Sequence, residues 1–371
     1  MEGWRKYKLG EIITLKYGKD HKKLSDGFYP VYGSGGIMRY GNSYIYDQPS
    51  ILIPRKGSLN NMMFIDKPFW TVDTMFWSII NDKMVLPRFL YYALSKYDFA
   101  SLNVGSAVPS LTVPVIENIE IIIPSISEQK QILSTLVPLD DKIALNTRIN
   151  DNLEQQAENL YNELFANESV SGLINLGDVV ETTSGGTPSR SNPYFYKKGT
   201  LNWVKSKELN GTFIINTEEF ITDMAVRKSA AKMLPENSVL IAMYGATVGE
   251  YAIIFKQMAC NQAICALLPS NNYPYTYLFM FAKRKKEELI NKAIGSAQQN
   301  ISQILVKQLS ISKNIELIKK YDLIVYPFFE KIKKNVIEKE SLSQLRDSLL
   351  SKLMSGELKI NDLNNYTYGR K

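Results

Sequence analysis

The chain has 371 residues, more than one ordinary hydrophobic core holds, and this length predicts two or three domains. Apolar residues make up 45% and charged residues 22%, which excludes a disordered chain. The longest apolar runs, such as residues 119–124 and 238–244, fall far short of the roughly 18 residues that a membrane span needs. The first residues lack the apolar core of a secretory signal, so we expect a cytoplasmic protein without a membrane partner.

The chain has two cysteines, Cys260 and Cys265, and one histidine, His21. A structural zinc site needs about four Cys or His ligands, so the sequence excludes one. A single histidine leaves little room for a Ser-His-Asp or Cys-His mechanism, and no phosphate-binding run of the type Gly-x-x-x-x-Gly-Lys-Ser/Thr occurs. We therefore expect two buried, reduced thiols, a solvated loop histidine, no metal site and no catalytic residues.

The sequence contains an internal repeat. Residues 9–13, LGEII, return as residues 176–180, LGDVV, and residues 50–53, SILI, return as residues 238–241, SVLI. A repeat of about 190 residues is too long for a solenoid unit and is typical of tandem domains. The second copy has about twenty extra residues before Ser238, and we expect the two copies to differ in specificity there.

Each copy is expected to have a globular part followed by a helical part. The globular parts, residues 1–124 and 173–312, contain short apolar runs between turn sequences such as YGSGG and TSGGTP, which indicates a mainly β or α+β fold. In the helical parts, residues 125–172 and 313–371, apolar residues recur every three or four positions. This spacing is typical of a heptad seam.

The two helical seams are expected to pair with one another. Their residues are Leu139, Ile143, Asn146, Leu153, Leu160 and Leu164 in the first helix, and Phe328, Ile332, Asn335, Leu342, Leu349 and Leu353 in the second. Asn146 and Asn335 hold the same position of the repeat, and a polar residue in a seam fixes register at a cost in stability. The alternative is that each amphipathic helix packs on its own globule. Pro138 and Pro327 predict a break or a kink, with a short helix before each long one.

Charge is distributed unevenly over these four parts. Residues 1–124 carry a net charge of +3 and residues 173–312 carry +5, whereas residues 125–172 carry −5 and residues 313–371 carry +4. Opposite charge on the two helical parts favours their pairing. The positive charge of the globules is a modest indication of nucleic-acid binding.

Four segments of the sequence resemble a known family. They are SGGTPSR at residues 184–190, WVKSKEL at residues 203–209, NQAICALL at residues 261–268 and PSISEQKQI at residues 124–132. Together with the order globule, helix, globule, helix, they make nearly the whole chain similar to the specificity subunit of type I restriction-modification systems.

The resemblance implies an α+β fold with two target recognition domains in a tandem pseudo-repeat, at residues 1–124 and 173–312. Conserved helical spacers, at residues 125–172 and 313–371, then follow, and their long helices form an antiparallel coiled coil. Each domain would bind one half of a bipartite, asymmetric double-stranded DNA target. A helix from Leu139 to Phe165 is roughly 40 Å long, close to one turn of B-DNA, which suits such a spacer.

The resemblance also implies partners and a biological role. The chain would be a non-catalytic subunit that docks two methyltransferase subunits and the restriction translocase subunits, in antiviral defence. S-adenosylmethionine, ATP and magnesium would then be bound by the partners, and no cofactor by this chain.

Residues for contact with DNA are expected in polar turns at the ends of apolar strands. The candidates are Arg39, Arg55, Lys56, Ser58 and Asn60 in the first globule, and Arg190, Lys205, Lys207, Tyr244 and Thr247 in the second. Arg can pair with guanine, Asn with adenine, and Lys or Ser with phosphate. For each of them an ordinary solvated loop residue is the alternative, and Gly57 and Gly245 are expected to serve the turns.

Another class of protein stays open from the residues alone. It is a two-domain enzyme or ligand-binding protein whose aromatic loops hold a sugar or a peptide. We further expect Tyr161, Phe165 and Phe329 to lie on outer faces of the long helices, where a partner would cover them.

Overall fold

The computed structural model describes residues 3–105, 108–165, 169–294 and 300–358. The last residues of the predicted second spacer, 359–371, lie outside these ranges. The chain forms two compact units: unit 1 consists of Met1–Asp141 with Leu342–Lys371, and unit 2 of Lys142–Ser341. These two units do not test the predicted division into four segments, which stays a prediction.

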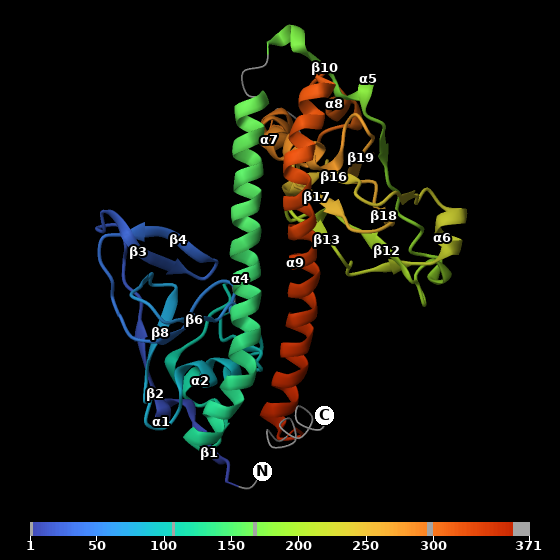
Figure 1. Cartoon of the computed structure of the whole chain (residues 1–371). Coiled ribbons are helices and arrows are strands. Elements are labelled where there is room, and N and C mark those ends of the chain that lie inside the picture. Colours follow the sequence, from blue (N-terminus) through green and yellow to red (C-terminus); the bar gives the residue numbers. More distant parts are fainter. Residues whose placement is uncertain (1–2, 106–107, 166–168, 295–299, 359–371) are drawn as a thin grey trace, which may run out of the picture. The chain divides into compact units, whose positions relative to one another are not determined.

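Unit 1 combines two sheets and a strand pair with short helices (Figure 1). Its strands are β1 (Arg5–Lys8), β2 (Ile13–Tyr17), β3 (Asp26–Gly33), β4 (Gly36–Gly41), β5 (Ser50–Pro54), β6 (Met63–Ile65), β7 (Trp70–Thr71), β8 (Met75–Ile80) and β9 (Glu120–Ile123). Its short helices are α1 (Leu9–Ile12), α2 (Pro87–Leu94), η1 (Phe99–Leu102) and α3 (Val113–Glu117). The sheets have the orders β2-β8-β5-β6 and β4-β3-β7, and β1 pairs with β9.

Unit 2 has the same kind of architecture. Its strands are β10 (Leu173–Asn175), β11 (Thr182–Ser184), β12 (Leu201–Val204), β13 (Phe213–Ile214), β14 (Phe220–Ile221), β15 (Met233–Leu234), β16 (Val239–Ala242), β17 (Tyr251–Ile254), β18 (Met258–Cys260), β19 (Ile264–Leu267) and β20 (Ser310–Ser312). Its shorter helices are η2 (Val170–Gly172), α5 (Leu176–Val179), η3 (Pro193–Phe195), η4 (Ser206–Glu208), α6 (Asp223–Lys228), η5 (Gly245–Thr247), α7 (Tyr275–Ile294) and α8 (Gln303–Lys307). The sheets have the orders β11-β19-β16-β17-β13 and β14-β12-β18-β15.

The two units repeat one topology, which the duplicated sequence predicts. The order β2-β8-β5-β6 of unit 1 returns as β11-β19-β16-β17 in unit 2, where β13 is added at the edge. The pair β1 with β9 returns as β10 with β20, both antiparallel. The backbone N–H of Leu9 donates to the carbonyl of Ile119, and that of Leu176 to the carbonyl of Leu309, both at 2.8 Å. The predicted tandem α+β pseudo-repeat is confirmed.

The second sheet of each unit also matches its counterpart, and we call these two sheets the small sheets. In unit 1, β3 pairs antiparallel with β4 and parallel with β7. In unit 2, β12 pairs antiparallel with β14 and parallel with β18. The extra residues of the second copy include η4 and β13, which lie between β12 and β14 along the chain. The extra segment therefore separates β12 from β14 of the small sheet along the chain and adds β13 to the larger sheet, in the part of the copy where the sequence predicts a difference in specificity.

Two long helices, α4 (Ile126–Phe165) and α9 (Ile315–Ser355), are antiparallel partners (Figure 1). In unit 2 the hydrogen bonds between them join Asn146 Nδ2 to Glu338 Oε2 at 2.8 Å, Asn335 Nδ2 to Asn150 Oδ1 at 2.7 Å and Tyr321 Oη to the Ala157 carbonyl at 3.1 Å. Residues later in α4 therefore bond to residues earlier in α9, as in an antiparallel pair. In unit 1 the same order continues, since Arg346 Nη1 donates to Asp140 Oδ1 at 2.9 Å. The predicted antiparallel helix pair is confirmed.

The predicted break at each proline is wrong. Pro138 lies within α4 and Pro327 within α9, and both helices continue past them. Proline removes one N–H donor, so the carbonyl four residues earlier loses its helical partner. Those carbonyls belong to Ser134 and Leu323, which are exposed, as both prolines are, so water can satisfy them.

The helices bury a wider face than the predicted seam. Ile132 and Leu136 of α4 pack with Leu350 and Leu353 of α9 in the core of unit 1. In unit 2, however, the buried positions of α4 move one residue along, to Tyr161 and Phe165, while Leu160 and Leu164 are only partly buried. Both alternatives from the sequence therefore hold in part, because the helices pair with each other and also pack on the globules.

Aromatic rings explain this shift in unit 2. Phe165 packs edge to face against Tyr277 of α7 with ring centroids 5.1 Å apart, and Phe329 against Phe279 at 5.5 Å. Tyr161, Phe165 and Phe329 are thus buried in their own unit. The expectation that they lie on outer faces is wrong, because α7 covers them.

The sequence PSISEQKQI fixes the start of α4 to unit 1. Gln129 is fully buried, accepts the N–H of Leu86 at 2.7 Å, and donates to the carbonyls of Met84 and Pro124 at 3.2 and 2.9 Å. The helix begins at Ile126, and its first turn is capped by the hydroxyl of Ser125, which accepts the N–H of Glu128.

Cys260 and Cys265 are free and buried, as the composition predicts. Burial raises the pKa of both thiols to about 12, so they stay protonated and unreactive. Within the described residues, no helix combines the length and apolar character required to cross a membrane.

Replacing Gln129 by alanine should destabilise unit 1 by about 2 to 4 kcal/mol, because the partly buried N–H of Leu86 and the buried carbonyl of Pro124 lose this partner. Amide hydrogen exchange measures the effect separately in each unit: exchange should become faster in unit 1 and stay unchanged in unit 2. Gln131→Ala, at an exposed position of the same helix, is the control. Equal exchange in both variants would contradict the anchoring role of Gln129.

Candidate nucleic-acid interface

The ten predicted DNA-binding residues lie at two kinds of place. Six of them follow β5 or β16, two strands that hold the same place in the two copies of the repeat. They are Arg55, Lys56, Ser58 and Asn60 after β5, and Tyr244 and Thr247 after β16. We call these segments, residues 55–60 and 244–247, the strand-end turns. The other four, Arg39, Arg190, Lys205 and Lys207, lie on or beside the small sheets.

In the strand-end turn of unit 1, two candidates have structural partners. Arg55 Nε donates to the carbonyl of Asp73 at 2.8 Å, and Asn60 uses its amide to hold η1, with Nδ2 on Asp98 Oδ1 and Oδ1 on the N–H of Ala100, both at 2.9 Å. These two bonds fix the orientation of the amide, which leaves Asn60 one N–H and one acceptor lone pair. Lys56 and Ser58 are exposed beside it and remain available for phosphate.

The strand-end turn of unit 2 is built in the same way. Gly57 and Gly245 both have positive φ, +89° and +65°, so they serve the turns as predicted. Lys56 forms an isolated bridge with Ser110, and Tyr244 forms the equivalent bridge with Asn300. Tyr244 is exposed, whereas the hydroxyl of Thr247 donates to the carbonyl of Tyr244 at 2.9 Å.

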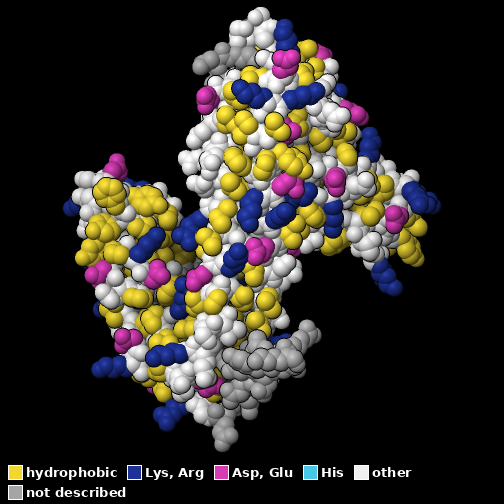
Figure 2. Space-filling view, viewed as in Figure 1, with side chains coloured by type: hydrophobic (Ala, Val, Ile, Leu, Met, Phe, Trp, Pro, Cys, Tyr) yellow, Lys and Arg dark blue, Asp and Glu magenta, His cyan; other side chains and the backbone are white. Residues whose placement is uncertain are grey.

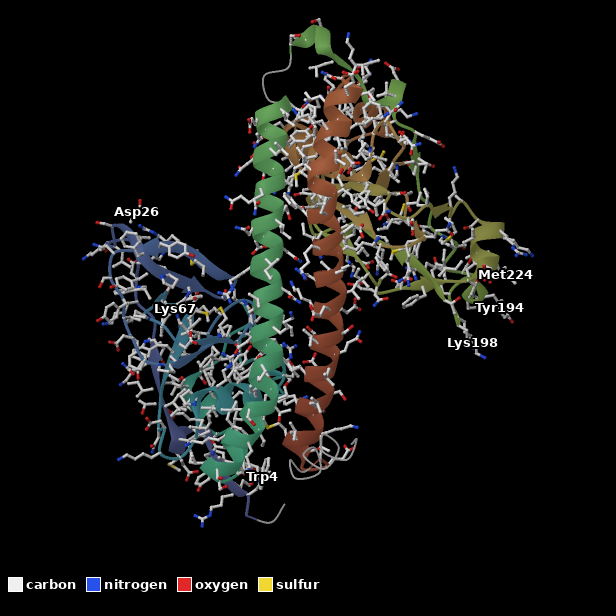
Figure 3. All side chains as sticks on the ribbon, in the orientation of Figure 1. Trp4, Asp26, Lys67, Tyr194, Lys198 and Met224 are labelled. Carbon is white, nitrogen blue, oxygen red and sulfur yellow. The ribbon has the colours of Figure 1, made fainter. Side chains whose placement is uncertain are left out.

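The small sheet of unit 1 carries Arg39 on β4. Its Nη2 pairs with Asp26 Oδ1 at 2.7 Å and donates to the carbonyl of Leu24 at 3.1 Å. Asp26 is almost fully exposed, and Figure 3 shows it at the outer end of β3 and β4. Arg39 is therefore held at the surface in a fixed orientation.

In unit 2 the three cationic candidates meet two carboxylates. Arg190 Nη1 lies 2.6 Å from Glu219, Lys205 Nζ lies 2.8 Å from Glu219 and 3.0 Å from Glu218, and Lys207 Nζ lies 2.6 Å from Glu218. We call these five residues the ion-pair cluster. It lies beside the small sheet, since Lys205 directly follows β12 and Glu219 directly precedes β14.

Aromatic rings orient the guanidinium of Arg190. It lies over the ring of Tyr196 at 4.3 Å and that of Trp203 at 5.4 Å, measured to the ring centroids. Stacking, together with the carboxylate of Glu219, holds the planar fork in one orientation while more than half of the side chain stays exposed. Such a fixed fork suits recognition of a guanine or a phosphate.

The ion pairs shift the acidity of these groups. Hydrogen bonds from Arg190 and Lys205 lower the pKa of Glu219 to about 2, and those from Lys207 and Lys205 lower the pKa of Glu218. The bond to Glu219 raises the pKa of both Arg190 and Lys205. The cluster is therefore fully ionised at neutral pH, with three positive and two negative charges.

The sequence did not indicate Glu218 and Glu219 as part of this site. They lie eleven or more residues from their partners along the chain, and only the pairing of β12 with β14 brings them close. A second group missed is exposed at the edge of unit 2: Figure 3 shows Tyr194, Lys198 and Met224 on this edge, near α6. The hydroxyl of Thr222, which caps α6, donates to the carbonyl of Tyr194 at 3.0 Å and joins the two segments.

The predicted spacer residues are distributed over both helices. Asn146, Ile332, Asn335 and Leu353 are buried, and the others, Leu139, Ile143, Leu153, Leu160, Leu164, Phe328, Leu342 and Leu349, are partly buried. Other apolar side chains of the helices are exposed instead: Leu145, Leu323, Ile324, Tyr326 and Leu345. The surface available to a partner on α4 and α9 is therefore formed by residues that the seam pattern did not predict.

Within the described part of the chain, no group of three or more His, Cys, Asp or Glu side chains has a geometry that could hold a metal ion. His21 lies in the loop before β3, partly buried.

Comparison with known proteins identifies the family. The family model for the type I restriction modification DNA specificity domain matches residues 1–155 and again residues 171–313. The chain belongs to this family. The resemblance seen in the four sequence segments is thus confirmed, and each copy of the internal repeat carries one such domain.

Curated relatives match over most of their length. The type I restriction enzyme HindI specificity subunit of Haemophilus influenzae is 24% identical, over 96% of this chain and all of that protein. The MjaIX specificity subunit of Methanocaldococcus jannaschii is 25% identical, over 86% of this chain and 80% of that protein. The crystal structure of the S subunit of a type I restriction-modification system from M. genitalium has the same fold, with a TM-score of 0.61 at 18% identity, over 94% of this chain and 96% of that one.

Replacing Glu219 by glutamine should destabilise unit 2 by about 1 kcal/mol at pH 7, since it removes the shared partner of Arg190 and Lys205 in a partly solvated site. The pKa of Glu219 is lower in the folded than in the unfolded chain, so its contribution is complete above pH 4.5 and is lost as the pH falls toward 2. The difference in urea midpoint between variant and wild type should shrink over this range. Glu236→Gln, at an exposed site, is the control, and a difference that does not depend on pH would contradict the ionic origin.

Proposed function

We propose that this chain is the DNA-recognition subunit of a type I restriction-modification complex. The observation that carries the proposal is the double match of the DNA specificity domain, once to each copy of the repeat. Each copy also presents cations and hydrogen-bond donors at a strand-end turn and beside a small sheet, which is the chemistry that contacts with phosphates and base edges require.

The two domains are proposed to bind different half-targets. Their topologies match, but their small sheets differ in length, in sequence and in the ion-pair cluster that only unit 2 has among the described residues. Two unlike domains on one chain suit an asymmetric, bipartite target, whereas a symmetric dimer suits a palindrome. Each domain then contributes its own half of the specificity.

We assign no catalytic step to this chain. Modification and cleavage are proposed to reside on methyltransferase and restriction subunits that dock on it, and S-adenosylmethionine, ATP and magnesium would bind there. Two methyltransferase subunits would suit the two copies of the repeat. Because such a complex would act on DNA inside the cell, we place it in the cytoplasm.

The competing interpretation, a two-domain enzyme or small-ligand binder with aromatic loops, has less support. Several aromatic side chains, for example Tyr273, Tyr275 and Tyr277, are packed in the core of unit 2 and do not line a ligand site. Family membership favours DNA as the ligand.

Exchanging residues 173–312 for the corresponding segment of another family member should change one half of the methylated target and leave the other half intact. The reason is that unit 1 supplies its own contacts, from its own sheets. Mapping methylated adenines in cells that carry the chimera and the methyltransferase subunit decides this. The reciprocal exchange of residues 5–123 is the matched control, and a change in both halves after either exchange would contradict separate recognition.

Adding four residues to each long helix should lengthen the non-specific gap within the target. The insertions belong after Asp141 in α4 and after Ser341 in α9, where the chain divides into its two units, so that contacts inside each unit are kept. Four helical residues add about 6 Å and roughly 40° of rotation, equivalent to nearly two base pairs. The mapped motif should show a longer gap with unchanged bases in both halves. An unchanged gap with full activity would mean that the helices do not set the spacing.

A further inference from the structure

Strands β3 and β4 form a two-stranded ribbon at the edge of the small sheet of unit 1, and this ribbon exposes an unusual number of large apolar side chains. The most exposed is Phe28 at 93%, and Ile37, Met38 and Tyr40 are each exposed by 48 to 57%. Figure 2 shows hydrophobic side chains gathered over the part of unit 1 where Figure 1 places β3 and β4. A patch of this kind on a soluble unit marks a binding surface.

Two bulges in the ribbon turn these side chains outward. The register of β3 with β4 shifts once between Asp26 and Tyr29 and again between Val31 and Tyr32. Phe28 lies on β3 inside the first shift, and Met38 is the extra residue of β4 at the second, between the paired residues Ile37 and Arg39. A bulge leaves its extra residue outside the regular alternation and re-aims its side chain.

The backbone accommodates this arrangement at Gly33. A Cβ atom at this position would lie 2.6 Å from the sulfur of Met38, so with any other residue here the flexible thioether would have to move. The ion pair of Arg39 with Asp26 holds the outer end of the ribbon. The exposed residues are thus presented by a defined backbone.

Lysines lie beside the ribbon and form no ion pair in the described part of the chain, although the backbone N–H and the charge of Lys22 help to lower the pKa of nearby Asp20. The loop that precedes β3 carries Lys19, Lys22 and Lys23, which are exposed and form no ion pair in the described residues. Hydrogen bonds tie the loop to the small sheet, from Lys19 N–H to the carbonyl of Thr71 at 2.9 Å and from Trp70 Nε1 to the carbonyl of Lys19 at 3.0 Å. The carboxylate of Asp20, in the same loop, accepts a hydrogen bond from the backbone N–H of Lys22 at 3.0 Å.

This combination fits DNA better than a protein partner. The cores of protein interfaces are depleted in lysine, whereas a row of free lysines beside an apolar ribbon matches phosphates beside base edges. A two-stranded ribbon also fits the major groove of B-DNA, where apolar side chains can contact thymine methyl groups. The strand-end turn of the same unit offers less, because Arg55 and Asn60 are used within the protein.

We infer that the β3–β4 ribbon is the element of unit 1 that enters a DNA groove, with Phe28, Met38 and Tyr40 against the bases and Lys22 and Lys23 on the flanking phosphates. This inference rests on the proposed function and names the surface that performs it in the first half of the target. The sequence predicted four contacts in residues 55–60 and one, Arg39, on β4, so the inference moves the main contact surface of unit 1 to the ribbon.

The test uses the chain assembled with its methyltransferase subunit and a duplex that contains the mapped target. The double variant Met38→Ser with Tyr40→Ser should bind this duplex at least 10-fold more weakly, and should tolerate base changes in one half of the target only. The double variant Lys22→Gln with Lys23→Gln should bind more weakly to all sequences. Its slope of log affinity against log salt should be smaller by about 1.8.

Ile79→Ser is the matched control, because Ile79 is an exposed apolar residue of β8 in the same unit. It should leave affinity and motif unchanged. Wild-type affinity and motif in both double variants would overturn the inference. So would a ribbon variant that assembles with the methyltransferase subunit only at a higher subunit concentration, but binds the duplex normally in the assembled complex, since the ribbon would then be a protein-docking surface.

Failure of the proposed function would look different. In that case the wild-type complex itself would yield no methylated motif and no preference for any duplex. A ribbon that is not the contact element would instead leave a mapped motif that the ribbon variants do not alter.

Discussion

The antiparallel packing of α4 against α9 is the interaction on which both units depend. The core of unit 1 includes Leu136 from α4 and Leu353 from α9, and the core of unit 2 includes Ala157 from α4 and Tyr321 from α9. Neither globule therefore completes its core from its own contiguous segment. Unit 1 in particular joins the beginning of the chain to residues after 341, and such distant contacts cost loop-closure entropy before they stabilise the fold.

Asparagines in the middle of this pairing trade stability for a unique register. Asn146 and Asn335 are buried, and the side-chain oxygen of each has no hydrogen-bond partner among the described residues. Apolar residues at these positions would avoid this cost in stability. The bonds from Asn146 to Glu338 and from Asn335 to Asn150 form in only one alignment of the helices. A slip by one heptad would leave these amides buried without those partners, so the register is defined by the cost of the alternatives.

How much the sequence predicts depends on whether a feature is local or distant. The repeat, the strand-rich globules, the long helices and the buried thiols follow from patterns within short windows, and all are present. The continuity of α4 through Pro138 depends on solvent reaching one carbonyl, and the shift from Leu160 to Tyr161 depends on rings of α7 more than a hundred residues away. The ion-pair cluster likewise requires β14 beside β12. Periodicity within one segment carries no information about such neighbours.

The carboxylates in the candidate interface change what the net charge of a globule means. Residues 173–312 carry +5, yet Arg190, Lys205 and Lys207 already have Glu218 and Glu219 as partners. If the duplex binds at this surface as proposed, its phosphates must compete with those carboxylates or lie beside them, so these three cations add less to sequence-independent affinity than their charge suggests. The carboxylate of Glu219 and the rings of Tyr196 and Trp203 orient the guanidinium of Arg190 in the free protein, which would lower the entropy cost of the proposed contact with DNA. A recognition subunit must find one target among many competing sites, and its specificity depends on the ratio of these two affinities rather than on the total positive charge.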